Sequence, residues 1–327
     1  MKTQRDPFIE IFRTLDFQKI KDHPNILIAA AFWEEDRYQA ARVCYRCLRI
    51  IDDMVDDRKA ENRPFSEAEK QQFMQSIRQW LHWLSEASTS GSKENELSIF
   101  PGQGFPETSG WMEQVASTFR EFLIPLRTME AFARSMMYDI DHDGFATFGD
   151  FLGYARGASV APATVFVHLA GLTRENQQYH LPPFDAEEAA TPCAIFSYLV
   201  HIIRDFQKDQ HNYLTYFPDE MILRYGVSRD DLRRFAFGDP VSPGFRLFIG
   251  DLYEQAGIYK ERTLEVMERI GPLLEPRYRL SLEVIFNLYL LVYEKIDPQQ
   301  GEFSSEALNP TPEETRERVL RTIQTFS

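Results

Sequence analysis

Cysteine is scarce in this chain of 327 residues, which contains only Cys44, Cys47 and Cys193. Three cysteines cannot build the disulfide framework of a small secreted domain. Cys44 and Cys47 have the C-x-x-C spacing found in zinc sites, but no second pair accompanies them. We therefore interpret both as small residues buried in a helix.

Basic residues are few relative to acidic ones. Lys and Arg number 36 while Asp and Glu number 50, which gives a formal charge of −14. An acidic chain is a poor candidate for nucleic-acid binding, because contacts with phosphate backbones need basic patches. The same acidity is compatible with a site that collects divalent cations.

A long, uninterrupted apolar run is also missing. The opening residues, MKTQRDPFIEIF, lack the apolar stretch of a signal peptide. The most apolar stretch, Leu280–Ile296, contains Glu283 and Lys295, so it predicts a buried helix rather than a membrane span. These features predict a soluble, cytoplasmic protein, and peripheral contact with a membrane remains open.

Alternating strand patterns are nearly absent, whereas apolar residues recur at helical spacing along most of the chain. This predicts an all-α protein with roughly eight to ten helices. The helical segments are Ala29–Val55, Gln72–Leu84, Trp111–Tyr138, Phe148–Leu172, Pro192–Gln207, Phe245–Ile270 and Pro276–Ile296. Pro125, Pro162, Gly250 and Gly257 fall inside these segments and predict kinks or breaks.

Ser85–Gly110 is rich in Ser, Gly and Glu, which is typical of a long surface loop or a flexible insertion. Acidic motifs that belong together lie on both sides of it, so we predict one domain over residues 1–327 with an insertion at 85–110. Near the end of the chain, Thr311 and Pro312 are followed by two glutamates. This pattern predicts a short helix over residues 311–326.

Four carboxylates lie within six residues at the end of the first predicted helix. Asp52 and Asp56 are one turn apart on one helix face. Asp53 and Asp57 repeat that spacing on the neighbouring face. Like charges at this spacing repel each other by about 0.2–0.5 kcal/mol per pair. The cluster is either a solvated helix end or a functional site, and its apolar flanks speak against a purely solvated end.

A second stripe lies about 150 residues further along the chain. His201, Asp205 and Asp209 are spaced i, i+4, i+8 and share one helix face over two turns. The preceding Ala194–Val200 is strongly apolar. Either the helix emerges into solvent here or the stripe is a site. Buried carboxylates would need cations or basic residues as partners.

The two stripes together predict one binding site for Mg²⁺ and a diphosphate. If the two helices face each other, four carboxylates surround one space. Mg²⁺ prefers oxygen ligands and is commonly held by a few carboxylates plus substrate phosphates. Arg49 and Arg204 precede the two motifs and can pair with the carboxylates or with diphosphate oxygens. The apolar helices around this space would hold a hydrophobic tail.

These motifs resemble those of the squalene/phytoene synthase family, the head-to-head isoprenoid synthases. The first motif, R-x-x-D-D-x-x-D-D, is Arg49–Asp57, and the second, R-D-x-x-x-D, is Arg204–Asp209. Tyr216-Phe217-Pro218 follows where the family has Tyr-Leu-Pro. The resemblance covers roughly residues 20 to 300 and implies an all-α, single-domain class I isoprenoid synthase bundle with a central apolar cavity.

Weaker matches accompany these motifs. Segments between the two motifs, Met137–Asp139 and Asp143–Tyr154, are similar to the family's M-x-D…Y-x-T-x-x-E-L-x-x-Y stretch, and Gly157–Ala163 stands in the place of its small-residue helix. His23-Pro24-Asn25 resembles the family's substrate-entry motif, and Tyr289–Val292 resembles its C-terminal core helix.

The resemblance implies roles for individual residues. Four aspartates are expected to act in catalysis and to hold Mg²⁺, or Mn²⁺ as the alternative cation: Asp52, Asp56, Asp205 and Asp209. His201 is an additional candidate ligand. Those expected to bind substrate are His23, Asn25, Arg49, Asp53, Asp139, Tyr154, Arg204, Tyr216 and Tyr289.

Four positions depart from the family pattern. His201 stands where the family usually has a metal-binding Asn, and imidazole suits Mg²⁺ poorly, so it could instead donate a hydrogen bond to diphosphate or titrate near neutral pH. Tyr198 replaces a Gln, Leu214 replaces a basic residue, and Pro162 interrupts the small-residue segment. The C-terminal segment is acidic where the family's is basic.

The implied reaction joins two C15 or C20 prenyl diphosphates through a cyclopropylcarbinyl diphosphate, giving a squalene-, dehydrosqualene- or phytoene-type product. Use of NADPH stays open, because no G-x-G-x-x-G motif is present but the family binds NADPH without one. The alternative is a related class I terpenoid enzyme that ionises a single prenyl diphosphate. A non-catalytic helical partner is the third class, and the two intact motifs argue against it. Oligomeric state is not predicted.

The segment Asp139–Asp150 has a separate interpretation. Its acidic residues and Gly144 fit several positions of an EF-hand calcium loop. Asp150 occupies the position where the loop needs a longer, bidentate Glu, and no second loop pairs with it. We therefore favour the isoprenoid-synthase interpretation of this segment.

Overall fold

The structure, a computed structural model, describes residues 6–18, 25–61, 65–89 and 109–326. The first part of the described chain forms α1 (Asp6–Thr14), α2 (Asn25–Ala30), α3 (Glu35–Ala60), α4 (Glu67–Thr89), α5 (Ser109–Glu121) and α6 (Leu126–Asp141). The central part forms α7 (Phe148–Ala155), a π-helix (Arg156–Val160), α8 (Ala161–Gly171), β1 (Thr173–Glu175), β2 (Gln178–His180) and α9 (Ala186–Arg204). The last part forms α10 (Phe206–His211), α11 (Asp219–Arg224), α12 (Arg229–Ala236), α13 (Pro243–Ile270), a 3₁₀ turn (Gly271–Leu273), α14 (Pro276–Lys295), α15 (Ser305–Leu308) and α16 (Pro312–Thr325).

The predicted all-α class is confirmed. The sixteen α-helices of the described residues exceed the roughly eight to ten that periodicity predicts, because helices as short as α11 and α15 carry too few residues for a periodic pattern. The antiparallel hairpin β1–β2, with Arg174 paired to Tyr179, is the one sheet in the described part of the chain. No described helix combines the length and the apolar character that crossing a membrane requires.

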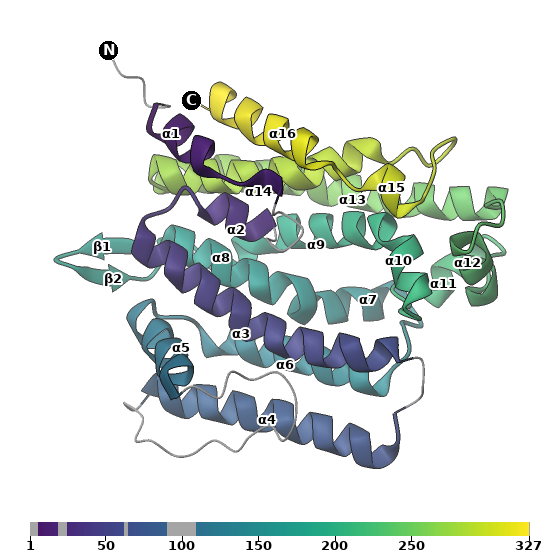
Figure 1. The fold of residues 1–327 in the computed structure, drawn as a ribbon, viewed down its shortest axis with the longest axis horizontal. Helices are drawn as coiled ribbons and strands as arrows, with labels where there is room; N and C mark the ends of the chain where they lie inside the picture. The colour runs from purple at the N-terminus through teal and green to yellow at the C-terminus, as the bar shows by residue number, and fades with distance from the viewer. Residues whose placement is uncertain (1–5, 19–24, 62–64, 90–108, 327) are drawn as a thin grey trace.

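α9 is the central helix of the bundle. It packs against α8, α13 and α14, and Figure 1 shows it in the middle of the molecule between α8 and the α13–α14 pair. Leu199, Val200 and Ile203 have no exposed surface, as expected of a helix covered on most sides. The Asp185 carboxylate caps its first turn by accepting hydrogen bonds from two backbone N–H groups. This helix carries one of the two acidic motifs into the core.

α3 carries the other motif and packs against α5, α6 and α8. The predicted single helix Ala29–Val55 is wrong, because a turn separates α2 from α3. In this turn Trp33 enters the core and packs on Phe166 of α8, with 4.7 Å between ring centroids. Glu34 then adopts an extended conformation and starts α3. The break thus serves a contact between residues far apart in sequence.

Other predicted interruptions have mixed outcomes. Trp111–Tyr138 is two helices, α5 and α6, because Leu123 has a positive φ of 50° and Pro125 is extended. α13 runs unbroken through Gly250 and Gly257, so the breaks predicted there are wrong.

The loop predicted at 85–110 is wrong at both ends. α4 continues to Thr89 and α5 begins at Ser109, and residues 90–108 lie outside the described residues. The C-terminal helix is confirmed as α16, which starts with a capping box between Thr311 and Glu314.

A π-helix connects α7 to α8 beside the centre of the molecule. Pro162 follows it in the first turn of α8, where a missing N–H is tolerated. Gly157 lies against α6, and a Cβ atom there would collide with the Ala131 carbonyl oxygen and with Ser135 Oγ. Ser135 donates a hydrogen bond of 2.7 Å to the Tyr154 carbonyl oxygen. The absence of a side chain at Gly157 therefore allows the close approach that positions the end of α7.

This contact can be tested with a pair of glycine substitutions. Gly157→Ala is expected to lower the free energy of unfolding by about 1–3 kcal/mol, because the added methyl group overpacks the interface with α6. Gly153→Ala is the matched control, since it has nothing within 4 Å of an added Cβ atom and helical Ala is favoured over Gly by about 0.5–1 kcal/mol. Thermal unfolding of both variants is the measurement. Equal melting temperatures would contradict the proposed close approach.

Candidate active site

The two acidic stripes border one internal cavity of about 640 Å³. This volume lies within the range of sites for small organic ligands. Asp52 and Asp56 contribute from α3, and Asp205 and Asp209 contribute from the junction of α9 with α10. The remaining wall is mainly apolar or aromatic and comes from α6, α8, α9, α13 and α14. The arrangement combines a carboxylate-rich region with an apolar chamber.

The second stripe keeps helical spacing across a helix junction. α9 ends at Arg204, and Asp205 stands between α9 and α10. The backbone N–H of Asp205 donates to the carbonyl oxygen of His201 at 2.8 Å, and that of Asp209 donates to the carbonyl oxygen of Asp205 at 2.8 Å. The i, i+4 contacts therefore persist, and the stripe predicted from spacing survives the break.

Two arginines pair with the acidic motifs. Arg49 Nη1 lies 2.5 Å from Asp52 Oδ2, and its Nη2 donates to Asp53. Arg204 binds Asp205 in bidentate fashion, with donor–acceptor distances of 2.8 Å and 2.6 Å. These pairs hold two carboxylates in place beside the cavity. Arg49 itself borders the cavity, whereas Arg204 does not.

Burial and mutual repulsion perturb the acidic groups that lack such a partner. Burial, Asp52 and Asp139 raise the pKa of Asp56 to about 7. Burial, together with the charges of Asp205 and Asp56, raises the pKa of Asp209 to about 8. Asp56 and Asp209 come from opposite motifs, so this interaction places the two stripes close enough to repel each other.

The two salt-bridged carboxyl groups of the stripes, Asp52 and Asp205, have pKa values shifted in opposite directions. Burial raises the pKa of Asp52 to about 6 despite Arg49, with Asp53 and Asp139 adding to the rise. Burial also opposes ionisation of Asp205, but the hydrogen bonds and charge of Arg204 outweigh it and lower the pKa of that carboxyl.

A divalent cation fits this donor set. Carboxylate oxygens are the ligands that Mg²⁺ prefers, and a bound cation would relieve the repulsion that raises the pKa of Asp56 and Asp209. Within the described residues, no three acidic, histidine or cysteine side chains already form a compact metal cluster. The residues that would hold the cation are Asp52, Asp56, Asp205 and Asp209.

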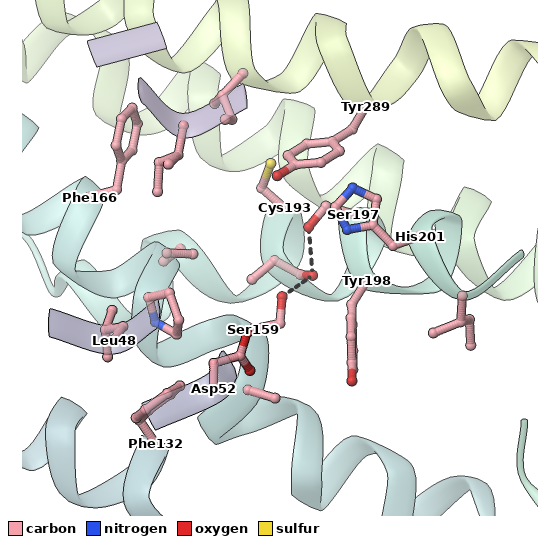
Figure 2. A pocket seen from close by; sticks show the side chains of 18 of the residues that line it. Leu48, Asp52, Phe132, Ser159, Phe166, Cys193, Ser197, Tyr198, His201 and Tyr289 are labelled. Carbon is pink, nitrogen blue, oxygen red and sulfur yellow. Dashed lines mark hydrogen bonds between the residues drawn. The ribbon is translucent and has the colours of Figure 1, made fainter. Parts of the chain in front are cut away.

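His201 borders the cavity, but the expectation that it titrates near neutral pH is wrong. Burial and the charge of Arg204 lower the pKa of His201 to about 3, so the ring is neutral. Its Nε2 atom is buried and has no hydrogen-bond partner. Tyr289 lies edge-on to the ring, with 5.0 Å between centroids. Figure 2 shows His201, Tyr289 and Tyr198 around the cavity that Asp52 also borders.

Three tyrosines line the middle of the cavity. The ring centroid of Tyr198 lies 6.3 Å from that of Tyr154 and 6.3 Å from that of Tyr216. The Tyr154 hydroxyl donates to Asp139, whose other oxygen accepts from Lys59 Nζ at 2.6 Å. Asp139 is only 5% exposed and does not border the cavity. The expectation that Asp139 lines the cavity is therefore wrong, because it sits behind Tyr154 and holds it.

The structure does not favour the EF-hand interpretation. Asp139 and Asp141 belong to α6, and they pair with Lys59 and Lys70. Asp150 belongs to the capping box of α7. These carboxylates do not form one calcium loop.

Of the described residues predicted to bind substrate, Asn25, Asp139 and Arg204 do not border the cavity. His23 lies outside the described residues. Asn25 begins α2 and does not border the cavity, whereas its neighbour Ile26 does.

Sequence reasoning missed several residues of the cavity wall. Lys208 stands between Asp205 and Asp209, and its position three residues after Asp205 is a signal that could have identified it. Ser159 and Ser197 both donate to the Ala194 carbonyl oxygen at 2.9 Å, as drawn in Figure 2. The apolar wall was predicted, but its individual residues were not identified, because periodicity does not distinguish a core face from a cavity face.

Comparison with known proteins agrees with this architecture. The sequence profile described as squalene/phytoene synthase matches residues 21–314. No curated protein matches the sequence.

Solved structures share the fold at low sequence identity. A dehydrosqualene synthase in complex with ligand is similar over 98% of this chain and 99% of its own, at 18% identity and a TM-score of 0.69. YisP from Bacillus subtilis is similar over 98% of this chain and 99% of its own, at 14% identity and a TM-score of 0.57. The squalene synthase HpnC from Alicyclobacillus acidocaldarius covers 79% of this chain and 93% of its own, at 13% identity and a TM-score of 0.52.

The raised pKa of Asp209 predicts a pH-dependent cost to stability. The folded-state pKa of about 8 lies above the unfolded value, so stability falls as the pH rises from about 4 to 8. In EDTA at pH 8, Asp209→Asn is therefore expected to stabilise the protein by about 1–3 kcal/mol after allowance for solvent screening. The gain should shrink toward pH 4. Thermal unfolding across this pH range measures it, and a loss of stability at pH 8 would contradict the repulsion.

Proposed function

The chain belongs to the squalene/phytoene synthase family of prenyltransferases, and from that premise we propose that it joins two prenyl diphosphates head to head with the help of Mg²⁺. The observation that carries the proposal is one cavity bordered by both acidic stripes and otherwise walled by apolar helices. Charged heads and hydrophobic tails of the substrates match these two regions.

The carboxylate-rich region would hold the diphosphates. Asp52, Asp56, Asp205 and Asp209 are the residues assigned to the cation. When bound, Mg²⁺ would supply positive charge that stabilises the departing diphosphate. Lys208 borders the same region and can donate hydrogen bonds to diphosphate oxygens.

Condensation begins with ionisation of the donor. Its C1–O bond breaks, and the electron pair leaves with the diphosphate. The double bond of the second molecule attacks the allylic cation, and loss of a proton closes a cyclopropane ring. The resulting cyclopropylcarbinyl diphosphate ionises in turn and rearranges. Residues that hold both tails side by side would supply the proximity that this coupling needs.

The chamber would protect the cationic intermediates. Phe166, Tyr198 and Tyr289 face the cavity with aromatic rings, and such rings attract positive charge without reacting with it. Their surroundings are apolar, which keeps water away from the cations. A hydrocarbon product would have low affinity for water, so we include peripheral contact with a membrane in the proposal.

One observation supports an alternative. The four positions that depart from the family pattern, Pro162, Tyr198, His201 and Leu214, all border the cavity. A changed polar region could ionise a single prenyl diphosphate and then cyclise the cation or transfer it to another acceptor.

A product assay tests both functions. Purified protein is incubated with Mg²⁺ and the C15 or the C20 diphosphate, with and without NADPH, and the organic extract is analysed by mass spectrometry. A C30 or C40 product supports head-to-head coupling and identifies the tail length. A product found only with NADPH indicates reductive termination. A C15 or C20 product, or diphosphate release without coupling, contradicts the head-to-head proposal and supports the alternative.

The acidic stripes can be tested separately from product identity. Asp52→Asn and Asp205→Asn are each expected to lower the rate of diphosphate release by about 10²–10³-fold, because each removes an electrostatic contribution to the transition state. Asp230→Asn is the matched control, since Asp230 is exposed on α12 and does not border the cavity. Release of inorganic diphosphate and the circular dichroism spectrum are measured together. Unchanged turnover in either stripe variant would overturn the site assignment.

A further inference from the structure

A second cavity of about 500 Å³ lies between α13 and α14. We call it the outer pocket. Its polar side chains are Glu268 on α13 and Arg279, Glu283 and Asn287 on α14. Glu268 is exposed and Leu264, also in its wall, is 43% exposed, so the pocket communicates with the surface.

The outer pocket and the chamber share two wall residues. Met267 of α13 and Leu282 of α14 border both cavities. Met267 is half-buried and Leu282 is 8% exposed. Two nearby residues of α13 each border one cavity: Val266 borders the chamber, and Leu264 borders the outer pocket. The side chains of Met267 and Leu282 thus form a shared wall.

The outer pocket is suited to water. Arg279 Nε donates to Glu283 Oε1 at 3.3 Å, and Asn287 Nδ2 donates to the Glu283 carbonyl oxygen at 2.9 Å. The Glu283 carboxylate and the Asn287 amide each have more than one hydrogen-bonding site. A pocket of this size with several polar partners meets the requirements for ordered water. The outer pocket therefore offers water a site on one side of the shared wall, and the apolar chamber lies on the other.

We propose that Met267 and Leu282 are the water barrier of the chamber, and that they direct the final carbocation toward an oxygen-free product. The inference rests on the proposed function, since it concerns how the cation formed in the chamber is quenched. With the wall closed, the cation loses a proton from a neighbouring carbon to the released diphosphate and becomes an alkene. With the wall open, the oxygen of water forms a bond to the cationic carbon and a proton passes to a second water, which gives an alcohol.

The barrier is tested by opening it. Met267→Ala is incubated with substrate and Mg²⁺ in H₂¹⁸O, and the extract is analysed by mass spectrometry. The share of ¹⁸O-labelled alcohol is expected to rise about tenfold over wild type, equivalent to about 1.4 kcal/mol between the two competing barriers. Leu282→Ala should act in the same direction. Met267→Leu, which refills the wall, should keep the wild-type product.

Val266→Ala is the matched control. It enlarges the chamber from the same helix without touching the shared wall, so its alcohol share should stay at the wild-type level. Equal labelling in Val266→Ala and Met267→Ala would overturn the proposal, because enlargement alone would explain it. Abundant labelled alcohol from the wild-type enzyme, or unchanged products in both wall variants, would also overturn it.

A second measurement does not depend on turnover. An anilinonaphthalene probe reports the polarity of its binding site through its emission maximum. A non-ionising prenyl thiodiphosphate displaces the probe that is bound in the chamber, and only the emission lost on its addition is compared between variants. A red shift in Met267→Ala but not in Val266→Ala supports the barrier, and equal maxima contradict it. If the head-to-head proposal fails, the wild-type enzyme forms no coupled product. The probe comparison still tests the barrier in that case, because it does not depend on turnover.

Discussion

Repulsion between buried carboxylates is the constraint on which the rest of this structure depends. Asp56 and Asp209 come from two different helices, and burial together with neighbouring carboxylates raises the pKa of both, with the charge of Asp56 contributing at Asp209. A fold that holds such groups together must offset their repulsion elsewhere. Arg49 and Arg204 neutralise one carboxylate in each stripe, and the apolar packing of α9 against α8 and α13 holds the helices in place. A cation held by these carboxylates, as proposed, would relieve this repulsion.

The acidic stripes could be predicted from the sequence because they depend on local geometry. Residues four apart share a helix face wherever the helix lies, so Asp52 and Asp56 meet one another before any tertiary contact is known. Apolar flanks on both motifs indicated that the faces turn inward. Even the break at Asp205 leaves this spacing unchanged. That both stripes border one cavity is a tertiary fact that the pairing of the motifs anticipated.

Other features depend on contacts between distant parts of the chain and could not be predicted. The turn between α2 and α3 allows Trp33 to pack on Phe166. The residues near Trp33 contain no turn signal from which this break could be predicted. Asp139 resembled a lining residue, but its partner Lys59 lies 80 positions away and holds it behind Tyr154. Val266 and Met267 are adjacent apolar residues of one helix, yet only the second borders two cavities.

The neutral state of His201 connects the charged region to the apolar chamber. In the proposed reaction, a protonated imidazole would place a positive charge beside the allylic cation, and like charges in a medium of low dielectric constant repel strongly. Burial and Arg204 keep the ring neutral by lowering the pKa of His201. Positive charge from the protein is therefore concentrated at Arg49, Arg204 and Lys208, next to the carboxylates. Beyond them the chamber presents aromatic rings and apolar walls, which is the environment in which a carbocation survives long enough to couple.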